Sequence, residues 1–292
     1  MFWHCGKYDF DLSHPLIMGI LNVTPDSFSD GGEHYDVASQ DGHSDADNIG
    51  AICDYARMMI HDGANIIDIG GESTRPGSDE VPINEELARV MPVVEALAKD
   101  ADAAGVAISI DTRHPSVAAA CVRAGASVIN DITGFTQADR VDVAKGCEAG
   151  CVIMHMRGNP KTMQAEPPYY DDVVRDVSDW LCAQARLLEG EGVSRERICI
   201  DPGPGFGKAR EHNLAILRAT DKMSRLGYAY MAAWSRKRFI GELTGIAAPA
   251  DRDVASAILA AYAVALGAHI VRVHNVAMTA QALKVASILV RE

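Results

Sequence analysis

The sequence contains no apolar run long enough to cross a membrane, and its first fifteen residues lack the basic flank and apolar stretch of a signal peptide. Its seven cysteines form no CxxC pair and have no histidine nearby at zinc-ligand spacing. Because 27 basic residues face 40 acidic ones, the net charge is −13, which argues against nucleic acid or an anionic membrane surface as the main partner. We therefore expect a cytoplasmic protein with reduced cysteines, in which a local cationic cluster must draw any anionic ligand.

The length of 292 residues bounds the domain organisation. A chain of this size can bury a large core, and α/β barrels commonly reach it as one domain. An apolar content of 48% with 23% charged residues is ordinary for a soluble globular protein. We therefore expect one domain over residues 1–292, with two long mobile loops at about residues 23–48 and 72–82.

The run Leu16–Leu21 is apolar throughout and ends in a polar residue, Asn22. Such a run is typical of a strand buried on both faces in a parallel sheet. The same pattern, followed by a stretch with helical period, occurs eight times and predicts an α/β fold of the (β/α)8 TIM-barrel class; an open doubly wound sheet is the alternative. The expected strands are 16–21, 65–71, 106–110, 127–129, 151–155, 198–200, 228–234 and 269–271, and the expected helices are 49–61, 85–99, 115–123, 141–149, 171–189, 214–226, 251–266 and 279–290.

Most of the expected strands end in a polar or charged residue, in contrast to their apolar interiors. A polar residue at one strand end is more often a helix cap or a solvated turn than a ligand. A barrel, however, brings all of its strand ends to one mouth, so the coincidence predicts a binding site there. The residues concerned are Asn22, Thr74, Arg75, Asp111, Asn130, Met154, Asp201, Lys237, Arg272 and His274.

These residues divide into two chemical groups. Asp111, Asn130 and Asp201 offer hydrogen-bond acceptors and Lys237 a donor, which suits a flat heterocycle with N–H groups on one edge and a carbonyl on another. The second group lies near the join of the first and last strands. Arg272 and His274 suit a phosphate or diphosphate, and Asn22 is a candidate ligand for a Mg²⁺ ion that bridges its oxygens.

Residues 201–208, DPGPGFGK, are similar to a dinucleotide fingerprint only in their glycine content. Their glycine spacing differs, and an Asp-Pro pair stands at the expected strand end. The glycines instead predict backbone that passes close to a ligand, with Phe206 lining an aromatic slot. Met154 is expected to pack at the barrel mouth, where it would also form a wall for a planar ring.

Taken in chain order, several stretches resemble the dihydropteroate synthase family of the folate pathway. They are GILNVTPDSFSDGG, IIDIGGESTRPG, ISIDT, INDI, MHMRGNPKTMQ, DPGPGFGK, SRKRFIGEL and RVHNV, and they extend from Leu16 to the end of the chain. The resemblance implies a (β/α)8 fold and a homodimer. It also implies condensation of 6-hydroxymethyl-7,8-dihydropterin diphosphate with 4-aminobenzoate to 7,8-dihydropteroate and diphosphate, in an enzyme family that sulfonamides inhibit.

The resemblance also assigns roles to individual residues. Asp111, Asn130, Asp201 and Lys237 would hold the pterin, with Met154 beside it. Arg272 would stack on the pterin and, with His274, bind the diphosphate, while Asn22 would ligate Mg²⁺ there. The aminobenzoate pocket would be assembled from Phe28, Thr74, Arg75, Pro76, Phe206, Ser235 and Lys237.

The chemistry implied by the resemblance explains these residue types. Departure of diphosphate from the pterin methylene leaves a conjugated carbocation, so cationic groups, Mg²⁺ and a dry pocket are needed more than a strong general base. An arylamine then attacks unaided. The two long loops would close over the site and exclude water.

The sequence departs from the family pattern at a few positions. Pro204 stands where an aromatic or aliphatic residue is expected, Trp234 replaces a smaller residue, and Asn275 replaces the usual aspartate after the last histidine. The first loop is also longer, through residues 39–48. None of these changes removes an expected pterin or diphosphate contact, but Trp234 and the loop are expected to alter the aminobenzoate pocket.

Two other functions share part of this pattern. A methyltetrahydrofolate-dependent methyltransferase would share the pterin-holding acids but would not need Thr74, Arg75 and Pro76 or the cationic residues that end the last two strands. A non-catalytic pterin-binding paralogue would bind pterin without turnover. Product formation from both substrates distinguishes the synthase from each of them.

Overall fold

The computed structural model describes residues 1–24, 45–73, 80–158, 163 and 169–289. Residues 25–44 of the first predicted loop and 74–79 of the second lie outside this range, so the prediction that these loops close over the site stays a prediction. The helix α2 (Asp45–His61) begins inside the stretch 23–48 that was predicted to be a loop. Among the described helices, none is long and apolar enough to cross a membrane.

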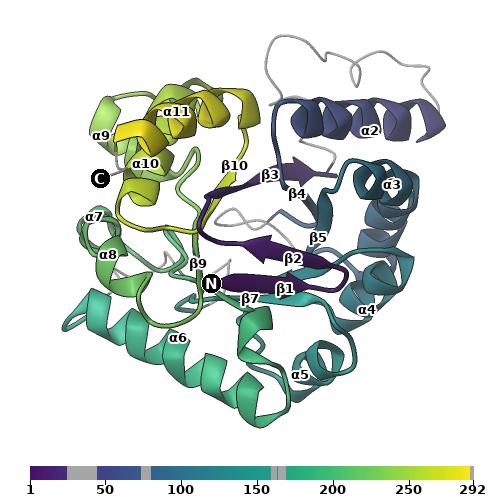
Figure 1. Ribbon diagram of the computed structural model, residues 1–292, viewed down its shortest axis with the longest axis horizontal. Helices are drawn as coiled ribbons and strands as arrows, with labels where there is room; N and C mark the ends of the chain where they lie inside the picture. Colours follow the sequence, from purple (N-terminus) through teal and green to yellow (C-terminus); the bar gives the residue numbers. More distant parts are fainter. Residues whose placement is uncertain (25–44, 74–79, 159–162, 164–168, 290–292) are drawn as a thin grey trace.

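Parallel strands close into a barrel, as the sequence predicts (Figure 1). The last strand pairs with the first through Arg272 and Met18, which rules out the open sheet. Each strand is hydrogen-bonded to the strand of the next unit in the chain. The barrel strands are β3 (Leu16–Asn22), β4 (Ile66–Gly70), β5 (Ala107–Asp111), β6 (Val128–Asp131), β7 (Gly150–Met154), β8 (Ile198–Asp201), β9 (Ala229–Ala232) and β10 (Ile270–Val273).

Helices surround the barrel, and most of them lie where the helical period predicts them (Figure 1). The predicted helix 214–226 was wrong in its bounds: two helices meet at Ala219, where the Thr220 hydroxyl donates to the Leu217 carbonyl and competes with the helical ladder. The helices after α2 are α3 (Ile83–Ala103), α4 (Pro115–Ala124), α5 (Ala138–Lys145), α6 (Val173–Gly190), α7 (Arg210–Arg218), α8 (Thr220–Met223), α9 (Arg238–Thr244), α10 (Asp253–Ala265) and α11 (Val276–Leu289), with 3-10 turns at Arg195–Arg197 and Ala250–Arg252.

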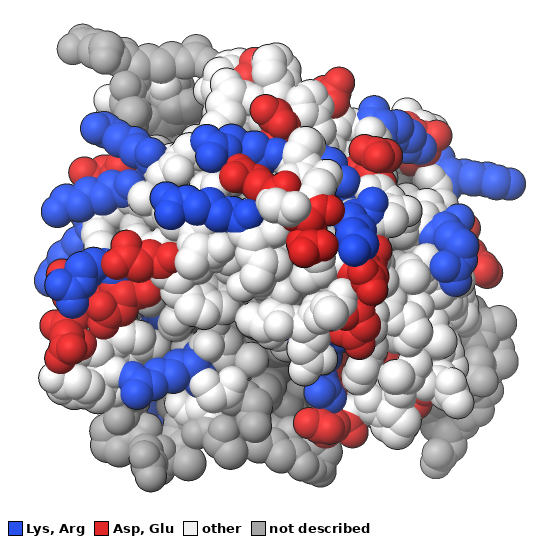
Figure 2. Space-filling model, turned by 90° about the horizontal axis from the view of Figure 1, so that it is seen from below, with Lys and Arg blue, Asp and Glu red and all other residues white. Residues whose placement is uncertain are grey.

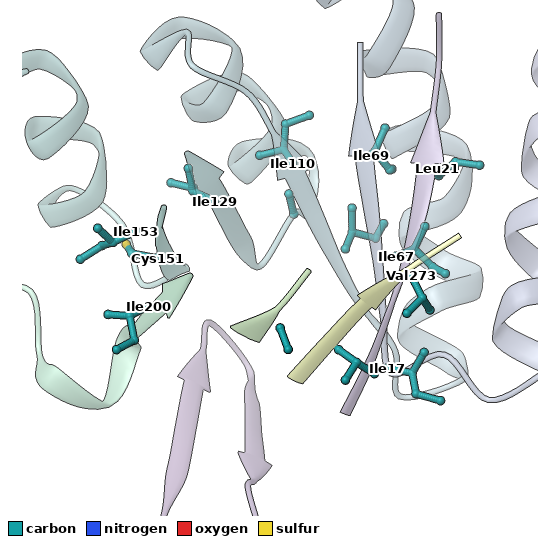
Figure 3. Packing of buried hydrophobic residues seen from close by; sticks show 14 of the residues in the cluster. Ile17, Leu21, Ile67, Ile69, Ile110, Ile129, Cys151, Ile153, Ile200 and Val273 are labelled. Carbon is teal, nitrogen blue, oxygen red and sulfur yellow. The ribbon is translucent and has the colours of Figure 1, made fainter. Parts of the chain in front are cut away.

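The barrel strands are buried on both faces, and their side chains alternate between two environments. Ile67, Ile69, Ile110 and Ile129 belong to the large core between the strands and the helices, and Figure 3 shows them on neighbouring strands. The alternate residues point inward. At the amino-terminal end of the barrel this inner layer is apolar and includes Met18, Ile66, Ala107, Val128, Val152, Cys199 and Ile270.

A short antiparallel hairpin, β1 (Phe2–Cys5) and β2 (Tyr8–Asp11), precedes the barrel and was not predicted from the sequence. It lies across the barrel in Figure 1. Trp3 is fully buried in the apolar inner layer, and its indole N–H donates to the Arg197 carbonyl at 3.0 Å. The hairpin therefore closes the amino-terminal end of the barrel with an aromatic side chain.

Charged side chains of both signs lie mainly over the upper and left parts of the face in Figure 2, around a broad uncharged area. On this face the described Lys and Arg side chains are interspersed with Asp and Glu, so positive charge does not gather into one broad patch.

We predict that Trp3→Ala lowers the free energy of unfolding by about 3–5 kcal/mol, because a fully buried indole and its hydrogen bond are lost and a cavity is left. Urea unfolding of the two proteins measures the change. The matched control is Phe2→Ala, since the Phe2 side chain beside it is half exposed. Equal stability losses in the two variants would contradict a role for Trp3 in closing the barrel.

Candidate active site

The strand register brings the predicted polar residues into one layer above the apolar inner layer. Asp111 pairs with Asn130 across β5 and β6, and Met154 pairs with Asp201 across β7 and β8. Side chains alternate along a strand, and each of these four residues lies an even number of residues beyond an inward-facing apolar residue of its own strand. Its side chain therefore points into the carboxyl end of the barrel. Arg272 follows Ile270 in the same way on β10.

Arg272 lies at the centre of this polar layer. Its Nε donates to Asp68 Oδ2 and its Nη2 to Asp111 Oδ2, each at 2.6 Å. The Asn130 amide donates to Asp68 Oδ2 at 3.0 Å. One guanidinium is thus held by two carboxylates from neighbouring strands, which fixes its plane across the mouth of the barrel.

Asp68 was missed as a site residue by the sequence analysis. It lies in the middle of β4 and is completely buried, and its Oδ1 has no hydrogen-bond partner among the described residues. The sequence does contain an indication, because an acid stands at an inward position within an otherwise apolar strand. An unsatisfied buried carboxylate oxygen marks a place where a ligand, a water or an ion belongs.

Burial adjusts the protonation of the polar layer. Burial raises the pKa of Asp111 to about 7, with Arg272 opposing this shift and Asp68 adding to it. Burial also raises the pKa of Asp201. Two groups oppose this shift: the Gly203 amide, which donates to Asp201 Oδ1 at 2.7 Å, and the Lys237 ammonium. Burial lowers the pKa of Lys237 to about 8, and the Arg272 charge lowers it further. Asp111 and Lys237 therefore titrate close to neutral pH, as acids and bases in binding sites often do.

A cluster of apolar side chains lies beside the acids. The Lys237 ammonium sits over the Phe206 ring, 4.4 Å from its centroid. Phe206 and Met154 belong to one buried cluster with Ile132 and Met163. The structure thus brings together the acceptors, the ammonium and the apolar side chains of Phe206 and Met154 that the sequence predicts, and such an arrangement fits a flat heterocycle.

The residues predicted to bind an anion lie at the join of β3, β9 and β10. His274 Nδ1 is 2.9 Å from the Ser235 hydroxyl, which also accepts from the His274 amide at 3.2 Å. Asn22 ends β3 with an exposed side chain. The described residues contain no group of three or more His, Cys, Asp or Glu able to hold a metal ion, so a metal here would need ligands from a bound anion.

Other predicted residues fall outside the described structure. The side chains of Phe28, Thr74, Arg75 and Pro76 belong to residues 25–44 and 74–79, which lie outside the described range. Their assignment to a second pocket therefore stays a prediction. Glu72 lies just before residues 74–79 in the chain and is described. Its carboxylate accepts two hydrogen bonds from Arg113, at 2.8 and 3.0 Å.

Two of the sequence departures have a structural explanation. Trp234 is buried in the core between the strands and the helices, where its ring meets Phe239 edge to face, so its side chain does not belong to the apolar cluster at the mouth. Asn275 donates to Asp253 Oδ2 at 3.0 Å, and Asp253 also accepts two hydrogen bonds from Arg236. An aspartate in place of Asn275 would set two carboxylates together, whereas the amide provides a donor.

Comparisons with known proteins agree with this geometry. The model of a family described as pterin binding enzyme matches residues 18–274. Dihydropteroate synthase from Escherichia coli is 43% identical over 275 residues, 94% of this chain and 92% of that protein. The Yersinia pestis dihydropteroate synthase structure, a sulfonamide drug complex, matches with a TM-score of 0.89 at 38% identity over 99% of each chain. The Burkholderia cenocepacia enzyme complexed with 7,8-dihydropteroate matches with a TM-score of 0.85 at 42% identity over 99% of this chain and 96% of that one.

We predict that Asp68→Asn lowers the pKa of Asp111 below about 7, because the Asp68 charge is one of the contributions that raise it. Titration of the aspartate carboxyl carbons by ¹³C NMR measures this pKa. The control is Asp131→Asn, since that buried carboxylate accepts from Thr133 and Phe135 instead and its loss should leave Asp111 unchanged. An unchanged or higher Asp111 pKa in Asp68→Asn would show that the two acids are not coupled.

Proposed function

The chain belongs to the pterin-binding enzyme family and to its dihydropteroate synthases, and from that premise we propose how its barrel mouth holds the substrates. The reaction condenses 6-hydroxymethyl-7,8-dihydropterin diphosphate with 4-aminobenzoate to give 7,8-dihydropteroate and diphosphate. The relatives support neither the methyltransferase nor the non-catalytic paralogue. The observation that carries the placement is the layer of inward acids around Arg272, above an apolar barrel floor.

The pterin lies in the polar layer. Asp201 and Asn130 are both almost fully buried. The Asp201 carboxylate accepts hydrogen bonds from the amino and amide edge of the ring, and the Asn130 amide both accepts from and donates to that edge. Asp111 at the end of β5 and Lys237, just before α9, face it from other sides, and Met154 forms a wall of the slot. Arg272, whose plane is fixed by Asp68 and Asp111, stacks on the ring and completes the pocket.

The diphosphate lies toward the paired strands β3 and β10, where Asn22 ends β3, Arg272 is near the end of β10 and His274 follows it. Asn22 would hold Mg²⁺ through its side-chain carbonyl, an oxygen donor of the kind this ion prefers, and oxygens of a bound diphosphate would supply further ligands. When bound, Mg²⁺ supplies positive charge that stabilises the leaving diphosphate. His274 is oriented by its contact with Ser235, and both it and Arg272 present N–H donors to the anion.

4-Aminobenzoate lies on the outer side of the pterin, against Phe206 and Lys237, with Ser235 nearby. Phe28, Thr74, Arg75 and Pro76 complete this pocket in our proposal, and sulfonamides compete for it. The reaction breaks the bond between the pterin methylene and diphosphate first. The arylamine nitrogen then attacks the resulting carbocation and loses a proton, so the residues serve chiefly to stabilise charge and exclude water.

A homodimer is supported by exposed apolar side chains on the helices α10 and α11. On α10 the exposed residues are spaced four apart and so share one side of the helix. The helices α10 and α11 pack against each other, and Figure 1 shows them side by side. A face of this kind is typical of an interface between identical subunits. Its exposed residues are Val254, Ile258, Tyr262, Val285, Ile288 and Leu289. The cytoplasmic location stays a prediction.

We expect the purified protein to release diphosphate and form 7,8-dihydropteroate only when both substrates and Mg²⁺ are present. Asn22→Ala should raise the Mg²⁺ concentration for half-maximal rate about tenfold, because one oxygen ligand is lost. Asn22→Asp retains an oxygen ligand and is the matched control. A chelator that leaves the rate unchanged, or an Asn22→Ala variant with the Mg²⁺ dependence of the parent protein, would refute the metal assignment.

For the dimer we predict that Ile258→Glu combined with Ile288→Glu gives a monomer, because two buried charges would face each other across the interface. Sedimentation velocity measures the mass of the parent protein and the variant. Leu187→Glu on α6 changes an exposed apolar residue elsewhere and should leave the mass unchanged. A parent protein that sediments as a monomer, or a charged variant that remains a dimer, contradicts this interface.

A further inference from the structure

Lys208 has no part in the proposed chemistry, yet it is buried directly behind the active site. It follows the glycine-rich loop after β8, and only 3% of its surface is exposed. Its Nζ donates to the carbonyls of Gly203 at 2.9 Å, Phe206 at 3.1 Å and His155 at 3.2 Å. It also lies 2.9 Å from His155 Nδ1. Four partners from two loops therefore surround one ammonium group.

Such a burial is costly and requires compensation. Burial lowers the pKa of Lys208 to about 7, although Asp201 opposes the shift. Burial also lowers the pKa of His155 to about 3, with Lys208 adding to the effect, so this ring is neutral and acts as a hydrogen-bond partner rather than a second cation. Because Lys208 is buried, it contributes neither to solubility nor to surface charge. Its three hydrogen bonds to backbone carbonyls compensate for the cost of its burial.

The two loops that Lys208 joins touch each other backbone to backbone. Gly203 has a φ of +63°, and a Cβ there would overlap the His155 carbonyl oxygen. Gly207, with a φ of +66°, would bring a Cβ within 2.7 Å of the Arg157 carbonyl oxygen. On the other side, Asn213 accepts from the Gly205 amide at 2.9 Å. The loop after β8 is therefore held at Gly203 and Gly207 against the loop after β7, and at Gly205 against α7.

This arrangement fixes an active-site side chain. The Phe206 carbonyl is bound by Lys208, while the Phe206 ring faces Lys237 and packs in the cluster with Met154. We propose that Lys208 is a positioning residue for 4-aminobenzoate, which ties the Gly203–Phe206 backbone to His155 and so holds the Phe206 ring beside Lys237. The inference rests on the proposed placement of 4-aminobenzoate at Phe206.

The test compares steady-state constants of Lys208→Met with those of the parent enzyme. Methionine fills a similar volume but donates no hydrogen bond, so we expect the KM for 4-aminobenzoate to rise about tenfold. The kcat and the KM for the pterin diphosphate should change less than about twofold, because Asp201 and Met154 are held by the strand register.

Arg197→Met is the matched control. Arg197 is also a buried cation that donates to backbone carbonyls, those of Ala144 and Ala149, but it lies at the opposite end of β8. The Arg197→Met variant should be less stable than the parent enzyme, but its KM for 4-aminobenzoate should not change more than its KM for the pterin diphosphate. Equal changes in the two variants, or equal changes for both substrates in Lys208→Met, would overturn the positioning role.

Two further variants separate the possible failures. If Lys208→Met does not fold, Lys208→Gln, which keeps an amide donor, should show a smaller rise in the same KM, and an unchanged KM overturns the proposal. Phe206→Ala tests the pocket itself and should raise the KM for 4-aminobenzoate. An unchanged KM in Phe206→Ala refutes the pocket and this inference together, whereas a change in Phe206→Ala without one in the Lys208 variants refutes the role of Lys208 alone.

Discussion

The pairing of Arg272 with Asp68 and Asp111 is the interaction on which the mouth of this barrel depends. Two carboxylates that point into a closed barrel would repel each other without a cation between them, and a buried guanidinium would be equally unstable without them. The three side chains come from β10, β4 and β5, so the pairing links strands that are not direct neighbours of β10 in the barrel. Charge balance at the mouth therefore depends on the closure of the barrel by β10 and β3.

The remaining features follow from the period of two along each strand. Outward residues form one core with the helices, and inward residues form an apolar floor that Trp3 of the hairpin completes. Further along the strands the same inward positions become Asn130 and Asp201, two residues beyond Val128 and Cys199, and Asp111, four residues beyond Ala107. A substrate therefore meets a pocket that is polar at its rim and dry beneath, in which hydrogen bonds and charges act strongly.

The sequence predicts the barrel and most of its rim because an apolar run followed by a polar residue is a strong local pattern, as at Asp111, Asn130 and Asp201. Asp68 escaped this reasoning because it lies inside a run, where only the inward or outward direction of a side chain reveals its role. Lys208 escaped because its partners are backbone carbonyls brought together by two separate loops. The hairpin was missed because four-residue strands outside the repeating pattern have little periodicity to detect.

The central claim is that the inward acids of the polar layer bind the pterin. Isothermal titration of 6-hydroxymethyl-7,8-dihydropterin diphosphate, with Mg²⁺ present, into the parent protein and Asp201→Asn tests it directly. The account predicts that the amide weakens binding about ten- to hundredfold, since a charged acceptor in a dry pocket is replaced by a neutral group. Equal affinities for the two proteins would contradict the account and would place the pterin elsewhere.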